Sequence, residues 1–106
     1  MTNSKLRVLV KRPGEPIEGK EIENTLESLQ EEAGGYIECV WLGGSILAIV
    51  DEEGKLKGKT ANFYFGGDLI VGTAIFLGEE GSEFRSLSDT EVGEVVRFLS
   101  EKGRTI

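Results

Sequence analysis

Alternation of apolar and polar side chains predicts a strand over Lys5–Lys11. Leu6, Val8 and Val10 share one face, and Leu9 is the only apolar exception on the other, which carries Lys5, Arg7 and Lys11. A Pro-Gly turn at residues 13–14 then ends the strand, because proline cannot continue a sheet ladder. The pattern is typical of a strand with one face buried and one face in solvent.

A helical period follows this turn. Apolar residues recur at i, i+4, i+7 and i+11, a spacing that places Ile22, Leu26, Leu29 and Ala33 on one stripe. The spacing predicts an amphipathic helix that starts at Gly19 or Lys20 and ends at Ala33. Gly34 or Gly35 supplies the left-handed cap that terminates such a helix.

The central part of the chain has the pattern of strands separated by tight turns. Residues 36–42 and 45–50 predict a hairpin around a Gly-Gly turn, followed by a polar turn over residues 51–55 in which Gly54 takes a positive φ. Residues 60–65 form a short aromatic segment. Residues 69–77 are apolar almost throughout and predict a single strand covered on both faces, before a turn at residues 78–82.

The last segment predicts a helix with a capping box. Ser88 precedes Glu91 by three residues, and Gly103 follows a buried stripe made by Val92, Val95, Val96 and Leu99. The elements add up to an α+β fold: a mostly antiparallel sheet of four to five strands with two helices on one face, in the order β-α-β-β-(β)-β-α. We expect one domain over residues 1–106, with frayed ends at 1–4 and 104–106.

Charge narrows the classes of partner. The 106 residues include 19 acidic and 12 basic ones and no histidine, which gives a net charge of −7. This field disfavours direct nucleic acid binding and favours a basic protein surface, such as the groove of a nuclease. One cysteine excludes an internal disulfide, and we find neither a secretory leader nor an apolar run long enough to span a bilayer. We therefore expect a cytoplasmic protein without a membrane segment.

Several blocks of the sequence resemble an uncharacterised domain-of-unknown-function family of phages, plasmids and low-GC Gram-positive bacteria. The residues that carry the resemblance are 22–30, Gly34-Gly35-Tyr36-Ile37-Glu38, Asp51-Glu52-Glu53-Gly54-Lys55-Leu56, Asn62, 70–74 and 84–89. Members of that family often have Asn in place of Asp51 and an Asn-Arg pair in place of Asn62-Phe63. The resemblance implies a mobile-element habitat, in the host cytoplasm if the chain is phage-encoded, and implies no activity.

Catalytic chemistry finds little support in the sequence. Without histidine there is no common nucleophilic triad and no imidazole metal site, and Cys39 has the pattern of a small buried residue. The carboxylates at 51–53 and 79–80 lack the spacing of a calcium loop, and the doublets Gly43-Gly44 and Gly66-Gly67 are hairpin turns rather than phosphate loops. We predict no catalytic residue, cofactor or metal, and therefore a protein that is not an enzyme.

The acidic residues suggest a protein-binding role. Glu23, Glu27 and Glu31 recur at i, i+4 and i+8, so the predicted helix carries an acidic ridge whose alternative interpretation is a solvated face. The ridge would imitate a row of phosphates and block a nucleic-acid-processing or defence enzyme of the host, in the manner of an anti-CRISPR or antirestriction protein. The candidate partner-binding residues are Glu23, Glu27, Glu31, Glu32, Asp51, Glu52, Glu53, Trp41 and Tyr64.

A second hypothesis remains open. The chain would be a non-enzymatic regulatory module that binds a small ligand or assembles as a homo-oligomer. Its structural marker would be an apolar pocket near Trp41, Asn62 and Tyr64, or a homodimer built on an exposed sheet edge.

Overall fold

The computed structural model describes residues 4–106 and confirms the α+β class. Eight strands and two helices make up the described chain. Their bounds are β1 Lys5–Lys11, β2 Glu18–Glu23, α1 Leu26–Ala33, β3 Ile37–Gly43, β4 Ile46–Asp51, β5 Ala61–Phe65, β6 Asp68–Val71, β7 Ala74–Glu80, β8 Glu83–Arg85 and α2 Asp89–Ser100.

The main sheet has six strands, more than the sequence pattern predicts. Five of them follow the order β2-β1-β7-β4-β3, and β8 pairs with β7 beyond the end of β1. All of these pairings are antiparallel. The hairpin β5-β6 forms a separate two-stranded sheet, closed by a Gly66-Gly67 turn in which both residues have positive φ. In the main sheet β2 and β3 are the outer strands.

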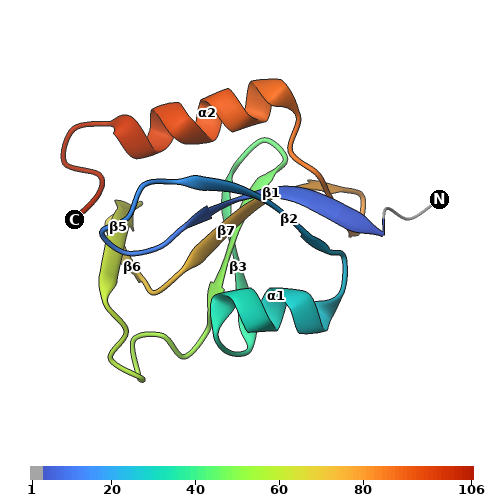
Figure 1. Cartoon of the computed structure of the whole chain (residues 1–106). Helices are drawn as coiled ribbons and strands as arrows, with labels where there is room; N and C mark the ends of the chain where they lie inside the picture. Colours follow the sequence, from blue (N-terminus) through green and yellow to red (C-terminus); the bar gives the residue numbers. More distant parts are fainter. Residues whose placement is uncertain (1–3) are drawn as a thin grey trace.

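The two helices cover opposite faces of the main sheet, so the prediction that both lie on one face is wrong. Figure 1 shows α2 above the sheet and α1 below it. Leu29 and Ala33 of α1 pack on the face that includes Leu47, whereas Val95 and Leu99 of α2 pack on the other face. Every residue of β4 is buried, as expected of a strand covered on both sides.

The predicted first helix is too long by two turns. Residues 18–23 form β2, which pairs with β1 in a hairpin that sets Ile22 opposite Leu6. The helix starts only at Leu26, where the Thr25 hydroxyl accepts a hydrogen bond from the Ser28 backbone N–H. Because Ile22 lies on a strand, its helical spacing from Leu26 is coincidental, and Leu26 is 58% exposed.

Two further sequence predictions fail at glycine residues. The apolar run 69–77 splits into β6 and β7 because Gly72 adopts a φ of +74°. In the turn after β4, the positive φ belongs to Gly58 rather than to Gly54. A side chain at position 54 is disfavoured by space rather than by φ, since a Cβ there would lie 3.0 Å from Val71 Cγ2.

The C-terminal segment is ordered rather than frayed. Arg104 places its guanidinium 4.1 Å above the ring of Phe98 and accepts, through its carbonyl, the backbone N–H of Tyr64. Ile106 donates its N–H to the carbonyl of Asn62. At the other end Lys5 already belongs to β1, while residues 1–3 lie outside the described part of the chain.

Candidate functional site

A buried carboxylate joins the end of α1 to the turn after β4. Asp51 has a side chain that is 1% exposed, and both Lys57 Nζ and Lys59 Nζ lie 2.8 Å from its Oδ2. Its Oδ1 accepts the N–H of Glu53 at 2.9 Å. Burial by itself raises the pKa of Asp51, but the hydrogen bonds from the two lysines outweigh it and hold this pKa well below its ordinary value. We call Asp51, Lys57 and Lys59 the Asp51 ion cluster.

Gly34 and Gly35 leave room for this cluster, and Gly34, with a φ of +82°, is also the left-handed cap predicted at the end of α1. Lys59 Nζ also donates to the carbonyl of Ala33 at 3.0 Å, which caps the free C-terminal end of α1. A Cβ on Gly34 would lie 2.7 Å from Lys59 Nζ, and a Cβ on Gly35 would lie 2.7 Å from both carboxylate oxygens of Asp51. Two blocks of the family resemblance, around 34–38 and 51–56, therefore meet in one structural contact.

We predict that Gly35→Ala destabilises the fold by about 2 kcal/mol, because the added Cβ would lie 2.6 Å from Lys57 Nζ and 2.7 Å from the carboxylate oxygens of the buried Asp51, whose ion pair must then shift. Gly93→Ala is the matched control, since Gly93 lies in α2 with no atom within 4 Å of a Cβ built there. That control gains about 0.5–1 kcal/mol from helix propensity. Urea unfolding of both variants measures the difference; equal stabilities would contradict the assigned contact.

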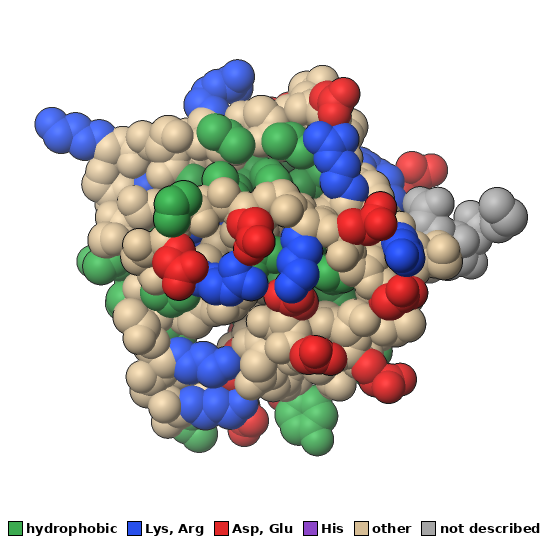
Figure 2. Space-filling model, viewed as in Figure 1, with side chains coloured by type: hydrophobic (Ala, Val, Ile, Leu, Met, Phe, Trp, Pro, Cys, Tyr) green, Lys and Arg blue, Asp and Glu red, His purple; other side chains and the backbone are tan. Residues whose placement is uncertain are grey.

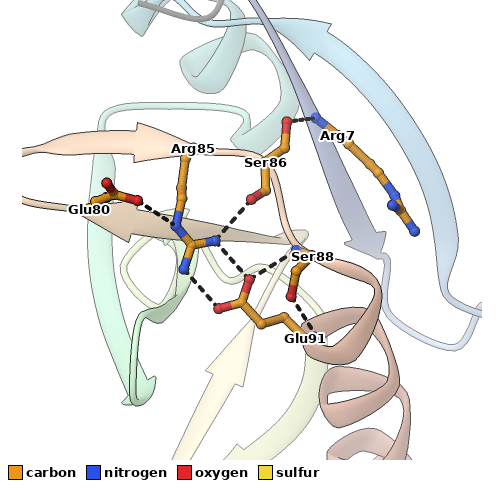
Figure 3. Close-up of polar contacts among 6 residues, drawn as sticks. All are labelled: Arg7, Glu80, Arg85, Ser86, Ser88 and Glu91. Atoms are coloured by element: carbon orange, nitrogen blue, oxygen red, sulfur yellow. Dashed lines mark hydrogen bonds and ion pairs between the residues drawn. The ribbon is translucent and has the colours of Figure 1, made fainter.

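A second polar network fastens α2 to β8 (Figure 3). Arg85 donates two hydrogen bonds, of 2.7 and 2.9 Å, to the carboxylate of Glu91. Glu91 also accepts the N–H of Ser88, whose hydroxyl accepts the N–H of Glu91, so the predicted capping box is confirmed. Ser86 extends the network to β1, because its hydroxyl accepts the N–H of Arg7. These contacts hold the helix on the sheet.

The Glu91 network makes the free energy of unfolding depend on pH. The hydrogen bond from Arg85 lowers the pKa of Glu91 from 4.5 to about 2, so this carboxylate stabilises the fold above pH 4.5 and its contribution is lost as the pH falls towards 2. We predict that Glu91→Gln costs about 1–2 kcal/mol at pH 7 and flattens the pH profile over that interval. Urea unfolding at pH 7, 4.5 and 3 tests this; a variant with the wild-type slope would contradict it.

Strand β3 is the open edge of the main sheet. It pairs with β4 alone in the described chain, and none of its seven residues is buried. The carbonyl of Tyr36 accepts the N–H of Glu52, so by antiparallel alternation Ile37, Cys39 and Trp41 turn their backbone N–H and C=O groups away from β4. Charged side chains on an edge strand discourage pairing with another chain. Strand β3 carries one, Glu38, whereas four of the six residues of β2 are charged.

Two pockets lie beside β3, on the face of the strand that bears Glu38, Val40 and Leu42. The first has a volume of about 230 Å³, and its polar walls include Glu38, Glu52 and Asp68. Asp68 is paired there with Lys55 at 2.5 Å. The second has a volume of about 200 Å³ and is mainly apolar, lined by Leu42, Gly43, Ile46, Glu94, Val95 and Phe98. The open backbone and these two pockets together are called the β3 edge site.

The surroundings of β3 are negatively charged. Burial raises the pKa of the Cys39 thiol, and the charges of Glu79 and Glu38 raise it further. The thiolate form is therefore disfavoured. Cys39 is only partly buried, where the sequence pattern predicts a buried residue, because it lies on the outer strand and packs against the core from one side. Trp41 stands on this edge with 55% of its surface exposed.

The predicted acidic ridge does not form on one helix, because Glu23 belongs to β2; of its three glutamates, Glu27 and Glu31 lie on α1, where both are exposed. Glu32 is held by Lys20 and Arg12. On the face seen in Figure 2, basic and acidic side chains are interspersed rather than sorted into an acidic stripe.

The other predicted partner-binding residues are also dispersed. Asp51 is buried in its ion cluster, while Glu52 and Glu53 are exposed at the start of the turn after β4. Tyr64 is exposed on β5, and neither Tyr64 nor Trp41 lines the Glu38 and Leu42 pockets beside β3 or the pocket that contains Lys11. Asn62 does not line any of these three pockets either.

The sequence pattern placed Lys11 on the solvent-facing side of the first strand, but the structure buries it. Lys11 is 7% exposed, because α2 covers the side of β1 that was expected to face solvent. Its Nζ donates to the carbonyl of Arg12 at 2.8 Å and to Asn62 Oδ1 at 3.3 Å. Asn62 is fully buried, and its Nδ2 donates to the carbonyls of Lys11 and Gly72. The one available signal was Leu9, the apolar residue on the supposedly polar face.

Comparison with known proteins places the chain in a family. A model described as Domain of unknown function (DUF3846) matches residues 6–100. The chain belongs to the DUF3846 family. No curated protein and no solved structure matches this DUF3846 chain.

Neither helix of the described DUF3846 chain has the length and hydropathy needed to cross a membrane. Within residues 4–106, no group of three or more acidic or cysteine side chains is arranged to hold a metal ion.

Proposed function

We propose that this DUF3846 chain is a non-enzymatic protein-binding module that takes up an extended, basic segment of a partner along β3. The observation that carries the proposal is the β3 edge site, which combines an unpaired strand edge with two side-chain pockets. Strand addition draws its affinity from main-chain hydrogen bonds and its specificity from pockets for alternate side chains. Strand β3 offers the open backbone, and its side chains form part of the lining of both pockets.

The chemistry of the two pockets defines the partner segment. Carboxylates at the first pocket suit a lysine or arginine side chain, which would bind Glu38 and Glu52 or replace Lys55 on Asp68. The second pocket suits an apolar side chain against Leu42 and Phe98. Glu38 and Leu42 are four residues apart, about 13 Å along a strand, so the two partner residues are two or four positions apart on one face.

The net charge of −7 would speed and strengthen the encounter with such a segment. A basic, extended segment is common in proteins that handle nucleic acid. The resemblance to phage and plasmid proteins therefore supports a narrower proposal: an accessory protein of a mobile element that inhibits a host defence or nucleic-acid-processing enzyme. The inhibition proposed here does not depend on mimicry of a phosphate row by the first helix, since Glu23 is not on that helix.

Selection from a library of displayed nine-residue peptides tests the proposal. We expect enriched peptides to share a basic and an apolar residue on the same face, and their affinity to fall as salt rises. Exchange of both Glu38 and Glu52 for Lys should weaken binding at least 10-fold. Exchange of both Glu21 and Glu23 for Lys, on the opposite outer strand, changes the net charge equally; it is the matched control and should have little effect.

Two results would overturn the proposal: enriched peptides without this pattern, or peptides whose binding ignores the reversal at Glu38 and Glu52. A second copy of the chain is the competing occupant of β3. A two-fold pairing centred on Cys39 would set the two thiols opposite each other, and it would appear as a dimer in size-exclusion chromatography with an oxidisable Cys39–Cys39 crosslink.

A further inference from the structure

A third pocket, distant in sequence from β3, contains a buried amino group. Its volume is about 310 Å³, and it lies between the loop after β1, the second half of α2 and the C-terminal segment. Lys11, Glu15, Ile17, Val96, Leu99 and Ile106 are the residues that matter for its chemistry. We call it the Lys11 pocket.

The Lys11 ammonium has one donor more than its partners use. It carries three N–H donors, and two acceptors are in place, the Arg12 carbonyl and Asn62 Oδ1. No ion pair joins Lys11 to a carboxylate in the described chain. A buried ammonium without a counter-ion is costly, and burial lowers the pKa of Lys11 although the charge of Glu15 partly offsets this. A ligand carboxylate would supply both the acceptor and the counter-charge.

The other walls restrict what else the ligand carries. Ile17, Val96, Leu99 and Ile106 offer an apolar surface, and Val96 is 41% exposed on a helix whose other core-facing positions are covered. Glu15 is exposed in the loop above Lys11 and would repel a simple anion. A ligand that has an ammonium group next to its carboxylate would satisfy Glu15 as well. Such a zwitterion has no net charge, so the acidic protein does not repel it.

We propose that the Lys11 pocket binds an aliphatic α-amino acid. Its carboxylate accepts from Lys11 Nζ, its ammonium faces Glu15, and its side chain packs on Ile17, Val96 and Leu99. This site is independent of the β3 edge site.

Titrations with leucine, hexanoate and hexylamine, followed by the NMR signals of the Ile17 and Val96 methyl groups, test the proposal. We expect saturable shifts with leucine in the millimolar range or tighter, and weaker shifts with either singly charged probe. Lys11→Met should abolish leucine binding, whereas Lys102→Met, at an exposed position, should leave it unchanged. Glu15→Gln should weaken leucine binding about 10-fold and improve the binding of hexanoate.

Because Lys11→Met also removes a hydrogen bond to Asn62, Ser100→Phe serves as a second variant. It fills the pocket and keeps Lys11 in place, so it should abolish leucine binding in a folded protein. Three results would overturn the proposal: no saturable leucine shift, leucine binding that persists in both pocket variants, or hexanoate binding as tight as that of leucine.

Discussion

Asp51→Ala is expected to destabilise the protein by about 3 kcal/mol, because the ammonium groups of Lys57 and Lys59 lose their shared carboxylate. The loss also releases the cap that Lys59 provides at the end of α1. Asp51→Asn should cost only about 1 kcal/mol, since an amide oxygen still accepts from a lysine. Urea unfolding at pH 7 gives the three free energies of unfolding.

Asp68→Ala is the control for this experiment. Asp68 also forms an ion pair with a lysine, but its side chain is 62% exposed, so the loss should be much smaller than for Asp51. Because the pKa of Asp51 is held low, its contribution is present above pH 4 and is lost as the pH falls. Equal stability losses for Asp51→Ala and Asp68→Ala would show that the Asp51 ion cluster does not organise the fold.

Cys39→Pro is expected to reduce the affinity for an enriched peptide at least 30-fold. Proline removes the outward N–H of Cys39, which a docked strand needs, and leaves the hydrogen bonds between β3 and β4 intact. Cys39→Ala is the control, since it also removes the thiol but keeps the N–H, and it should bind within about threefold of wild type. Fluorescence anisotropy with a labelled peptide measures all three affinities.

Peptide binding to folded Cys39→Pro with wild-type affinity would contradict strand addition. Circular dichroism and the unfolding midpoint establish whether the variant is folded. If it is not folded, amide hydrogen exchange of the wild-type protein in the presence of the peptide decides whether β3 takes up a strand.

Local patterns in the sequence predicted the fold where one interaction dominates. The capping box of α2 depends on Ser88 and Glu91 alone, and the hairpin β3-β4 depends on a glycine turn, so both could be recognised from a few residues. The first helix was overextended because Ile22 is buried on a strand at a spacing that also fits a helix. Only the pairing of β2 with β1, a contact between segments, distinguishes the two.

The candidate sites are formed by contacts between different segments of the chain, and the spacing of residues along the sequence does not predict such contacts. Asp51 follows a buried strand and precedes two glutamates, so its sequence context suggested a solvated turn. Its burial follows from Lys57 and Lys59, which reach it from the other side of the turn. Likewise, β3 became a candidate interface only once the strand order placed it at the edge of the sheet. Trp41 alone among the predicted partner-binding residues lies on that strand, and Glu52 lines a pocket beside it.

Amide hydrogen exchange of the wild-type protein, with and without an enriched peptide, tests the central claim most directly. Strand addition predicts that the outward amides of Ile37, Cys39 and Trp41 become protected at least 10-fold on binding, while Glu38 and Val40, already paired with β4, change little. Protection confined to α1 or to the turn after β4, with the outward amides of β3 unchanged, would contradict the claim that β3 is the binding strand.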